Sequence, residues 1–287
     1  LVVNSTGGDI SVVAITGTSV EDVTLNAAAG NVTVGVIGAA DGQISDVVLT
    51  GTTINLGGNI TTDDDADAGD VDINGNVILT AAVTIDTSDA AAGVVDGTFN
   101  ISGTVDGAFD LDIITDSAIA GIVGVIGGTT ALATLDINKT AGATGAVTIS
   151  NNIGAGAAGV TGALEIGNAN TSTLTLAGTV YNANAATYTA VAGDNISLTA
   201  GADVTFTSSN DAITFGTANI LLADGSDLVV TTGSGAGNIG VVAITGNTVE
   251  DVTLNAGTGN VTVGVIGALA AQINDVTLSG TTINLGG

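Results

Sequence analysis

The 287-residue sequence contains no Cys, His, Pro, Met or Trp, and Lys139 is its only basic residue. Without Cys and His, thiol and imidazole catalysis and the usual ligands of zinc, copper, haem and iron–sulfur clusters are excluded. A single basic residue cannot form the clustered Lys and Arg contacts that nucleic-acid binding requires. It also gives no basis for adhesion to anionic lipid head groups. The sequence therefore predicts that the chain binds no nucleic acid.

The sequence is rich in acidic residues and in small apolar residues. The chain has 28 acidic residues and a net charge of −27, with 45% hydrophobic but only 2% aromatic residues. The core must therefore be filled by Val, Ile, Leu and Ala. Abundant Thr, Val and Ile favour strands, and Asp, Asn and Gly favour turns. A mean hydropathy of +0.59 argues against disorder, the rival interpretation for such an acidic, Gly-rich chain.

The location of the protein is expected to be extracellular or at the cell surface. The longest apolar run, residues 118–128, is shorter than the roughly 18 to 20 residues that span a membrane as a helix, so no membrane insertion is predicted. The absence of Cys fits a secreted protein stabilised without disulfides as well as a cytosolic one, and the strong acidity favours the exterior. The sequence does not begin with Met, and we interpret it as a stretch of a longer chain.

A long internal repeat organises the sequence. Residues 13–58 and 242–287 align without a gap, and only ten of the 46 aligned positions differ. We therefore treat residues 1–287 as one continuous solenoid, in which 1–227 form a long unit and 228–287, a copy of 1–58, begin a second unit.

A shorter period lies inside the unit. Apolar and polar residues alternate over short segments such as Val32-Thr33-Val34 and Leu174-Thr175-Leu176, with Gly- and Asn-rich turns between them. A β-sandwich has similar spacing. The monotonous pattern, the few large core residues and the absence of a linker favour an all-β, elongated parallel β-solenoid with coils of roughly 20 residues.

The segments 145–180 and 192–232 resemble the repeats of large bacterial surface proteins of the filamentous-haemagglutinin or β-strand-repeat type. The resemblance covers nearly the whole chain. It implies a right-handed parallel β-helix, secretion, and a role as an adhesin, a stalk or an extracellular fibre. The family supplies no catalytic residues that could be carried over to this chain.

The acidic run in residues 63–72 is the strongest local candidate for a binding site. Ca²⁺ takes six to eight oxygen ligands from such carboxylate clusters, and the run matches the first half of an EF-hand loop, although Ala81 stands where that loop has Glu. The alternative is a solvated loop followed by a strand and an Asn-Gly turn. No cofactor is required, and Ca²⁺ is the one candidate. The candidate ligands are Asp63, Asp64, Asp65, Asp67, Asp70 and Asp72.

Other chemistry has less support in the sequence. Lys139 could form an isopeptide cross-link to an Asn, but we interpret it as a surface lysine in a turn. Two carboxylates can hydrolyse a glycan. The scattered aromatic residues, of which the Phe residues are expected in the core, do not form a sugar-binding groove, so we predict no enzyme. Pairs of the Thr-x-Thr type recur too irregularly for an ice-binding face.

The leading hypothesis is a structural segment of an extracellular fibre or filament whose partner is the chain itself, associated head-to-tail or laterally. The alternative is an adhesin stalk or binding module that contacts a glycan or a host surface. Exposed aromatic residues on a loop would favour the alternative, and the segment from Tyr181 to Tyr188 is its candidate.

Overall fold

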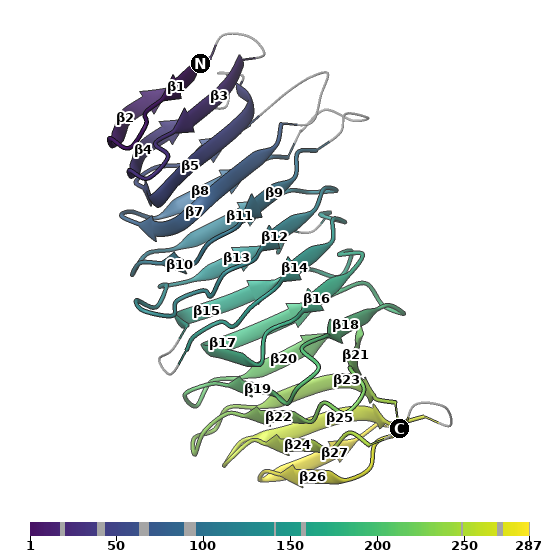
Figure 1. Ribbon diagram of the computed structural model, residues 1–287. Coiled ribbons are helices and arrows are strands. Elements are labelled where there is room, and N and C mark those ends of the chain that lie inside the picture. Colours follow the sequence, from purple (N-terminus) through teal and green to yellow (C-terminus); the bar gives the residue numbers. More distant parts are fainter. Residues whose placement is uncertain are drawn as a thin grey trace.

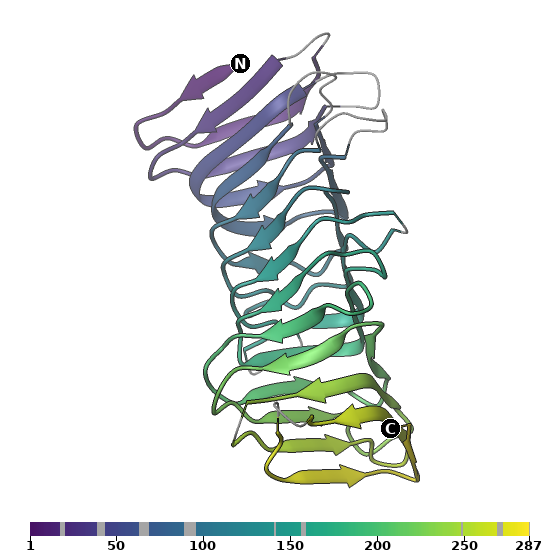
Figure 2. The ribbon, with the colours of Figure 1, turned by 90° about the vertical axis from the view of Figure 1, so that its right-hand side faces the viewer.

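A computed structural model of the chain shows an elongated stack of parallel β-strands, with the two termini at opposite ends (Figures 1 and 2). The structure describes residues 1–17, 21–38, 44–62, 69–88, 96–140, 142–155, 159–247, 249–268 and 272–286. Within these ranges there are 27 strands and no helix, and every strand pairing is parallel. None of the described residues forms a helix that is long and apolar enough to cross a membrane.

Each coil of the chain passes through three faces in the same order, which we number 1 to 3. Alternation of apolar and polar residues turns one side of each strand inward, as in the burial pattern of Leu174–Leu176, where only the central Thr175 is not buried. Eight strands lie wholly in face 1: β1 (Val2–Asn4), β3 (Glu21–Asn26), β9 (Phe99–Ile101), β12 (Ala120–Ile122), β14 (Val147–Ile149), β16 (Leu174–Leu176), β18 (Asn195–Leu198) and β21 (Asn219–Leu222).

Faces 2 and 3 are built in the same way. The strands confined to face 2 are β10 (Val105–Asp106), β19 (Val204–Thr207), β22 (Leu228–Thr231), β24 (Val252–Asn255) and β26 (Val276–Ser279). The strands confined to face 3 are β6 (Ile60–Thr61), β8 (Val83–Asp86), β11 (Leu111–Ile114), β13 (Leu135–Ile137), β15 (Val160–Ile166), β20 (Ile213–Gly216) and β27 (Thr282–Leu285).

Seven longer strands bend at a corner and contribute to two faces. They are β5 (Ile44–Leu56) and β7 (Val71–Leu79), which pass from face 1 to face 2, β2 (Ile10–Ile15), β4 (Val32–Ile37) and β17 (Val180–Thr189), which pass from face 2 to face 3, and β23 (Ile239–Thr245) and β25 (Asn260–Ile266), which pass from face 3 to face 1.

The core consists of columns of apolar side chains, one residue per coil. Eleven successive pairings join the column of face 3, so the solenoid makes about 11 turns. This column is Ile15, Ile37, Ile60, Ile85, Ile113, Ile137, Ile166, Tyr188, Phe215, Val241, Val263 and Leu285. Such columns bury apolar surface in every coil and fill the narrow interior without large side chains.

The structure confirms the predicted all-β parallel solenoid, but the coils are longer than predicted. A turn takes about 24 residues, not roughly 20. The step is 22 residues from Ile15 to Ile37 and 29 residues from Ile137 to Ile166. Three strands and three corners need more residues than the short alternating segments alone, and corner loops of unequal length supply them.

Corners where the chain turns from face 1 to face 2 are narrow. A Cβ on Gly103 would lie 2.2 Å from the carbonyl oxygen of Gly75, and one on Gly124 would lie 2.1 Å from that of Gly103. These distances are too short for any side chain, so glycines stack on one another in successive coils. The Gly-containing turns of the sequence thus mark corners at which neighbouring backbones approach closely.

The two copies of the repeated segment occupy different faces. Nine pairings lead along face 2 from Val32 to Leu254, and Val261, the counterpart of Val32, lies on the next face. Val36 lies in face 3, and its counterpart Val265 lies in face 1. The second copy therefore stands about nine and a third turns further on, or about 45 Å along the axis at about 4.8 Å per coil. It is rotated by about one third of a turn.

Candidate functional site

The predicted calcium ligands lie mostly outside the described residues. Asp63, Asp64, Asp65 and Asp67 belong to the range that the structure leaves undescribed. Asp70 lies at the corner before β7, and its carboxylate accepts hydrogen bonds from the backbone N–H (2.7 Å) and the hydroxyl (2.9 Å) of Thr98 in the next coil. Asp72 is exposed in the strand that follows. Asp70 is thus engaged in joining two coils.

The same contact recurs at corners along the whole solenoid. The backbone N–H of Asp227 donates to Oδ1 of Asp203 (3.3 Å), and that of Asp251 donates to Oδ1 of Asp227 (2.8 Å). Asn152 receives the N–H of Thr179 (2.7 Å) in the same way. We call this repeated contact the corner ladder. It gives Asp and Asn a structural role, because each side chain satisfies a backbone donor that the strand ladders leave open.

The described part of the acidic run contributes two of the predicted ligands, Asp70 and Asp72. Among the described residues, no group of three or more acidic side chains is placed to hold a metal ion. The four undescribed aspartates of the run are not covered by that statement, and the Ca²⁺ site remains a prediction. In the described part, Asp carboxylates at corners accept hydrogen bonds from the next coil.

Lys139 lies against a column of acidic residues on face 3. Register stacks Asp112, Asp136 and Glu165 on three successive coils. The Lys139 ammonium group forms an ion pair with Asp136 and a second with Glu165 at 3.3 Å. The side chain of Lys139 is 43% exposed. It is thus a partly exposed lysine whose ammonium group is ion-paired with two carboxylates.

Burial sets the protonation behaviour of this cluster. Burial first, and then the negative charge of Asp136, raise the pKa of the Asp112 carboxyl above its ordinary value. Burial also raises the pKa of Asp136, against the hydrogen bond from Lys139. That hydrogen bond, in turn, raises the pKa of Lys139. An ammonium group with a raised pKa stays charged at neutral pH and is a poor nucleophile.

The aromatic residues are mostly in the core. Tyr181 and Tyr188 are 1% and 0% exposed, and they stack in parallel on Phe206 and Phe215 with centroid distances of 4.7 and 5.3 Å. The expectation that the Tyr181–Tyr188 segment offers exposed aromatics to a ligand is therefore wrong. Phe109 differs in the other direction, since it is 40% exposed although a core position was expected.

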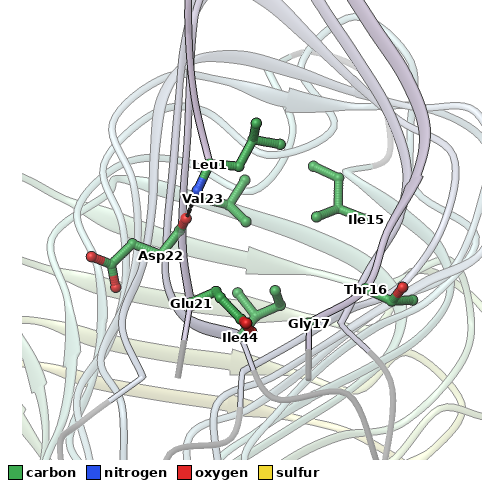
Figure 3. A pocket seen from close by; sticks show the side chains of 8 residues that line it. All are labelled: Leu1, Ile15, Thr16, Gly17, Glu21, Asp22, Val23 and Ile44. Carbon is green, nitrogen blue, oxygen red and sulfur yellow. Dashed lines mark hydrogen bonds between the residues drawn. The ribbon is translucent and has the colours of Figure 1, made fainter. Parts of the chain in front are cut away.

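A hollow opens at the N-terminal end of the solenoid (Figure 3). Leu1 and Val23 lie opposite Ile15, with Glu21 and Ile44 between them. Ile15 and Glu21 are only partly buried, whereas their counterparts in the second copy, Ile244 and Glu250, are 0% exposed.

The preceding coil covers this position in the second copy. Gly225, in the corner loop of that coil, donates its N–H to Oε1 of Glu250 at 3.1 Å, and Asn247 donates to Oε2 at 2.7 Å. A coil stacked on the N-terminal end would thus cover the position of Glu21 as the preceding coil covers Glu250.

At the C-terminal edge, too, residues are exposed whose counterparts in the other copy are buried. Val276, Ile283 and Leu285 are 46%, 42% and 67% exposed. Their counterparts in the first copy are 0% exposed, because the next coil pairs with them through β7. Those counterparts are Val47, Ile54 and Leu56. Both ends therefore present surfaces that this same sequence buries wherever another coil is stacked.

Sequence reasoning missed the corner ladder and the face 3 column of acids. The ladder has a signal, since an Asp or Asn directly precedes strands such as those starting at Val204, Leu228 and Val252. The column has none, because coil lengths vary and the register between coils is not visible in the sequence. Comparisons of the chain with protein-family models, curated proteins and solved structures gave no match.

Proposed function

We propose that the chain is a segment of the shaft of an extracellular or cell-surface fibre, in which β-solenoid units are stacked head-to-tail. The observation that carries this proposal is that the apolar positions exposed at the C-terminal edge are buried in the first copy, where a further coil follows them. An edge of this kind is a template for further parallel strands.

Junction geometry supports the same proposal. The last three strands of the long unit, β19, β20 and β21, pair directly with β22 and β23, which begin the second unit. The ladder therefore passes from one unit into the next without a break. A solenoid of this kind can be extended by whole units, and its role is mechanical, since hydrogen bonds between coils run along the axis.

Electron microscopy of the purified protein tests the proposal. We expect long fibres of uniform width with an axial repeat near the length of one chain, which is about 53 Å for about 11 turns at about 4.8 Å per coil. Short rods of a single length, about one solenoid long at every concentration and salt condition, would contradict head-to-tail stacking. The resemblance to filamentous-haemagglutinin-type proteins agrees with a fibre. We do not favour the adhesin alternative, because its candidate aromatic segment is buried.

A further inference from the structure

In each described copy of the repeat, the strands on both sides of one corner carry no charged side chain. In the first copy these strands lie in faces 2 and 3, within residues 10–15, 32–37 and 53–61. In the second copy they lie in faces 3 and 1, within residues 239–245 and 260–266. The acids of the described part of both copies lie at or next to the corners instead. In a chain of net charge −27, these strands form surfaces where repulsion between two copies is weakest.

An apolar strip runs along the corner that these uncharged strands flank. Val13 and Val36 lie on successive coils of the first copy and are 87% and 43% exposed. Their counterparts Val242 and Val265 are 44% and 49% exposed. The register is the same in both copies, since Ala14 pairs with Val36 and Ala243 pairs with Val265. We call each pair of valines a valine strip.

We infer that the two valine strips are lateral contact surfaces for a second copy of this chain. The inference rests on the proposed fibre and names the surface by which fibres associate side by side. Nearly identical strips can pair with themselves about a two-fold axis, which makes a second copy the natural occupant. Two copies approach most easily at these surfaces, because acids elsewhere on the rods repel each other.

The size of the strip defines how it acts. Two valine side chains bury far less than the about 800 Å² per partner of a stable complex. One strip therefore holds two chains only transiently, and many strips along a fibre act together through multivalency. Because the second strip is rotated by about a third of a turn and displaced along the axis, one chain contacts two neighbours in different directions. Such contacts build a bundle, whereas strips on a single face would build a ribbon.

Disulfide trapping tests the inference on single chains. The sequence has no Cys, so Val36→Cys and Val242→Cys each introduce one thiol into one strip, away from the hollow at the C-terminal edge. Val123→Cys is the matched control, since Val123 is 46% exposed and lies outside both copies. The measurement is the rate of disulfide-linked dimer formation under oxidising conditions, at equal protein concentration and at a salt concentration that screens the net charge.

We expect both strip variants to form dimers severalfold faster than the control, and their mixture to form heterodimers. Adding Val13→Asp should slow the Val36→Cys variant to the rate of the control while leaving the circular dichroism spectrum unchanged. Equal rates for Val36→Cys and Val123→Cys would overturn the inference, whether or not the aspartate variant folds. Fibre formation is observed separately by microscopy. Single fibres without lateral contacts would contradict only the valine strips, whereas a lack of fibres would contradict the proposed function.

Discussion

Asp112 shows how a single acidic residue can weaken this fold. Burial and the neighbouring Asp136 raise its pKa, so the folded state binds a proton more tightly than the unfolded state does. A carboxyl with a raised pKa destabilises the fold above that pKa, and the penalty is relieved as the pH falls toward the ordinary carboxyl value. The protonated form, not the ionised one, suits this position on face 3.

Asp112→Asn should therefore stabilise the protein at neutral pH. We expect an increase of about 1–2 °C in Tm at pH 7, which shrinks as the pH falls toward about 4. The measurement is thermal unfolding followed by circular dichroism over that pH range. Asp211→Asn is the control, because Asp211 is exposed and its backbone carbonyl accepts the hydrogen bond from the Ser208 hydroxyl. A gain that is constant with pH would show that the carboxyl charge is not the cause.

At the scale of the strand and its corner, the corner ladder joins successive coils. Asp227 accepts the N–H of Asp251, and its own N–H donates to Asp203. Asp227→Ala removes the acceptor and should lower the free energy of unfolding by about 1 kcal/mol. Asp227→Asn keeps an acceptor and removes one charge between two others, so we expect it to be neutral or stabilising at low salt. Chemical denaturation at low and high salt measures both variants, and equal losses for Ala and Asn would contradict the ladder.

The glycine corners give a second prediction at this scale. Gly103→Ala places a Cβ 2.2 Å from the Gly75 carbonyl oxygen, and backbone must move to admit it. We expect a loss of about 1–3 kcal/mol. Gly121→Ala, in the neighbouring strand β12, meets nothing closer than 3.7 Å and should cost little or nothing. Urea unfolding of the two variants tests the difference, and similar midpoints would show that the corner can relax.

The sequence predicts the elements of this fold better than their stacking. Alternation identifies strands such as Val147–Ile149 and Leu174–Leu176, because one side of each must be buried. Register is different: Val147 pairs with Leu174 at a separation of 27 residues, whereas Val32 pairs with Ile54 at 22. Since corner loops absorb these differences, neither the third-of-a-turn offset nor the acids stacked around Lys139 can be read from spacing alone.

At the scale of the whole molecule, the net charge of −27 determines how the stability of the rod depends on salt. Raising the ionic strength from about 0.01 to about 0.1 M shortens the Debye length from about 30 to about 10 Å. Repulsion between acids on neighbouring coils then weakens, and Tm should rise. A Tm that is unchanged or lower at the higher salt concentration would contradict this account of the charge.

Calcium gives the sharper comparison for the same rod, because screening and specific binding predict different results. At equal ionic strength, a site in residues 63–72 that binds only the folded state would add about 2.7 kcal/mol at a Ca²⁺ concentration 100 times its Kd. Thermal unfolding in CaCl₂, in NaCl matched for ionic strength, and in CaCl₂ with excess chelator separates the two effects. A rise specific to Ca²⁺ that is lost in Asp70→Asn would place Asp70 among the ligands. Equal Tm values in the two salts would leave the acidic run with a structural role alone.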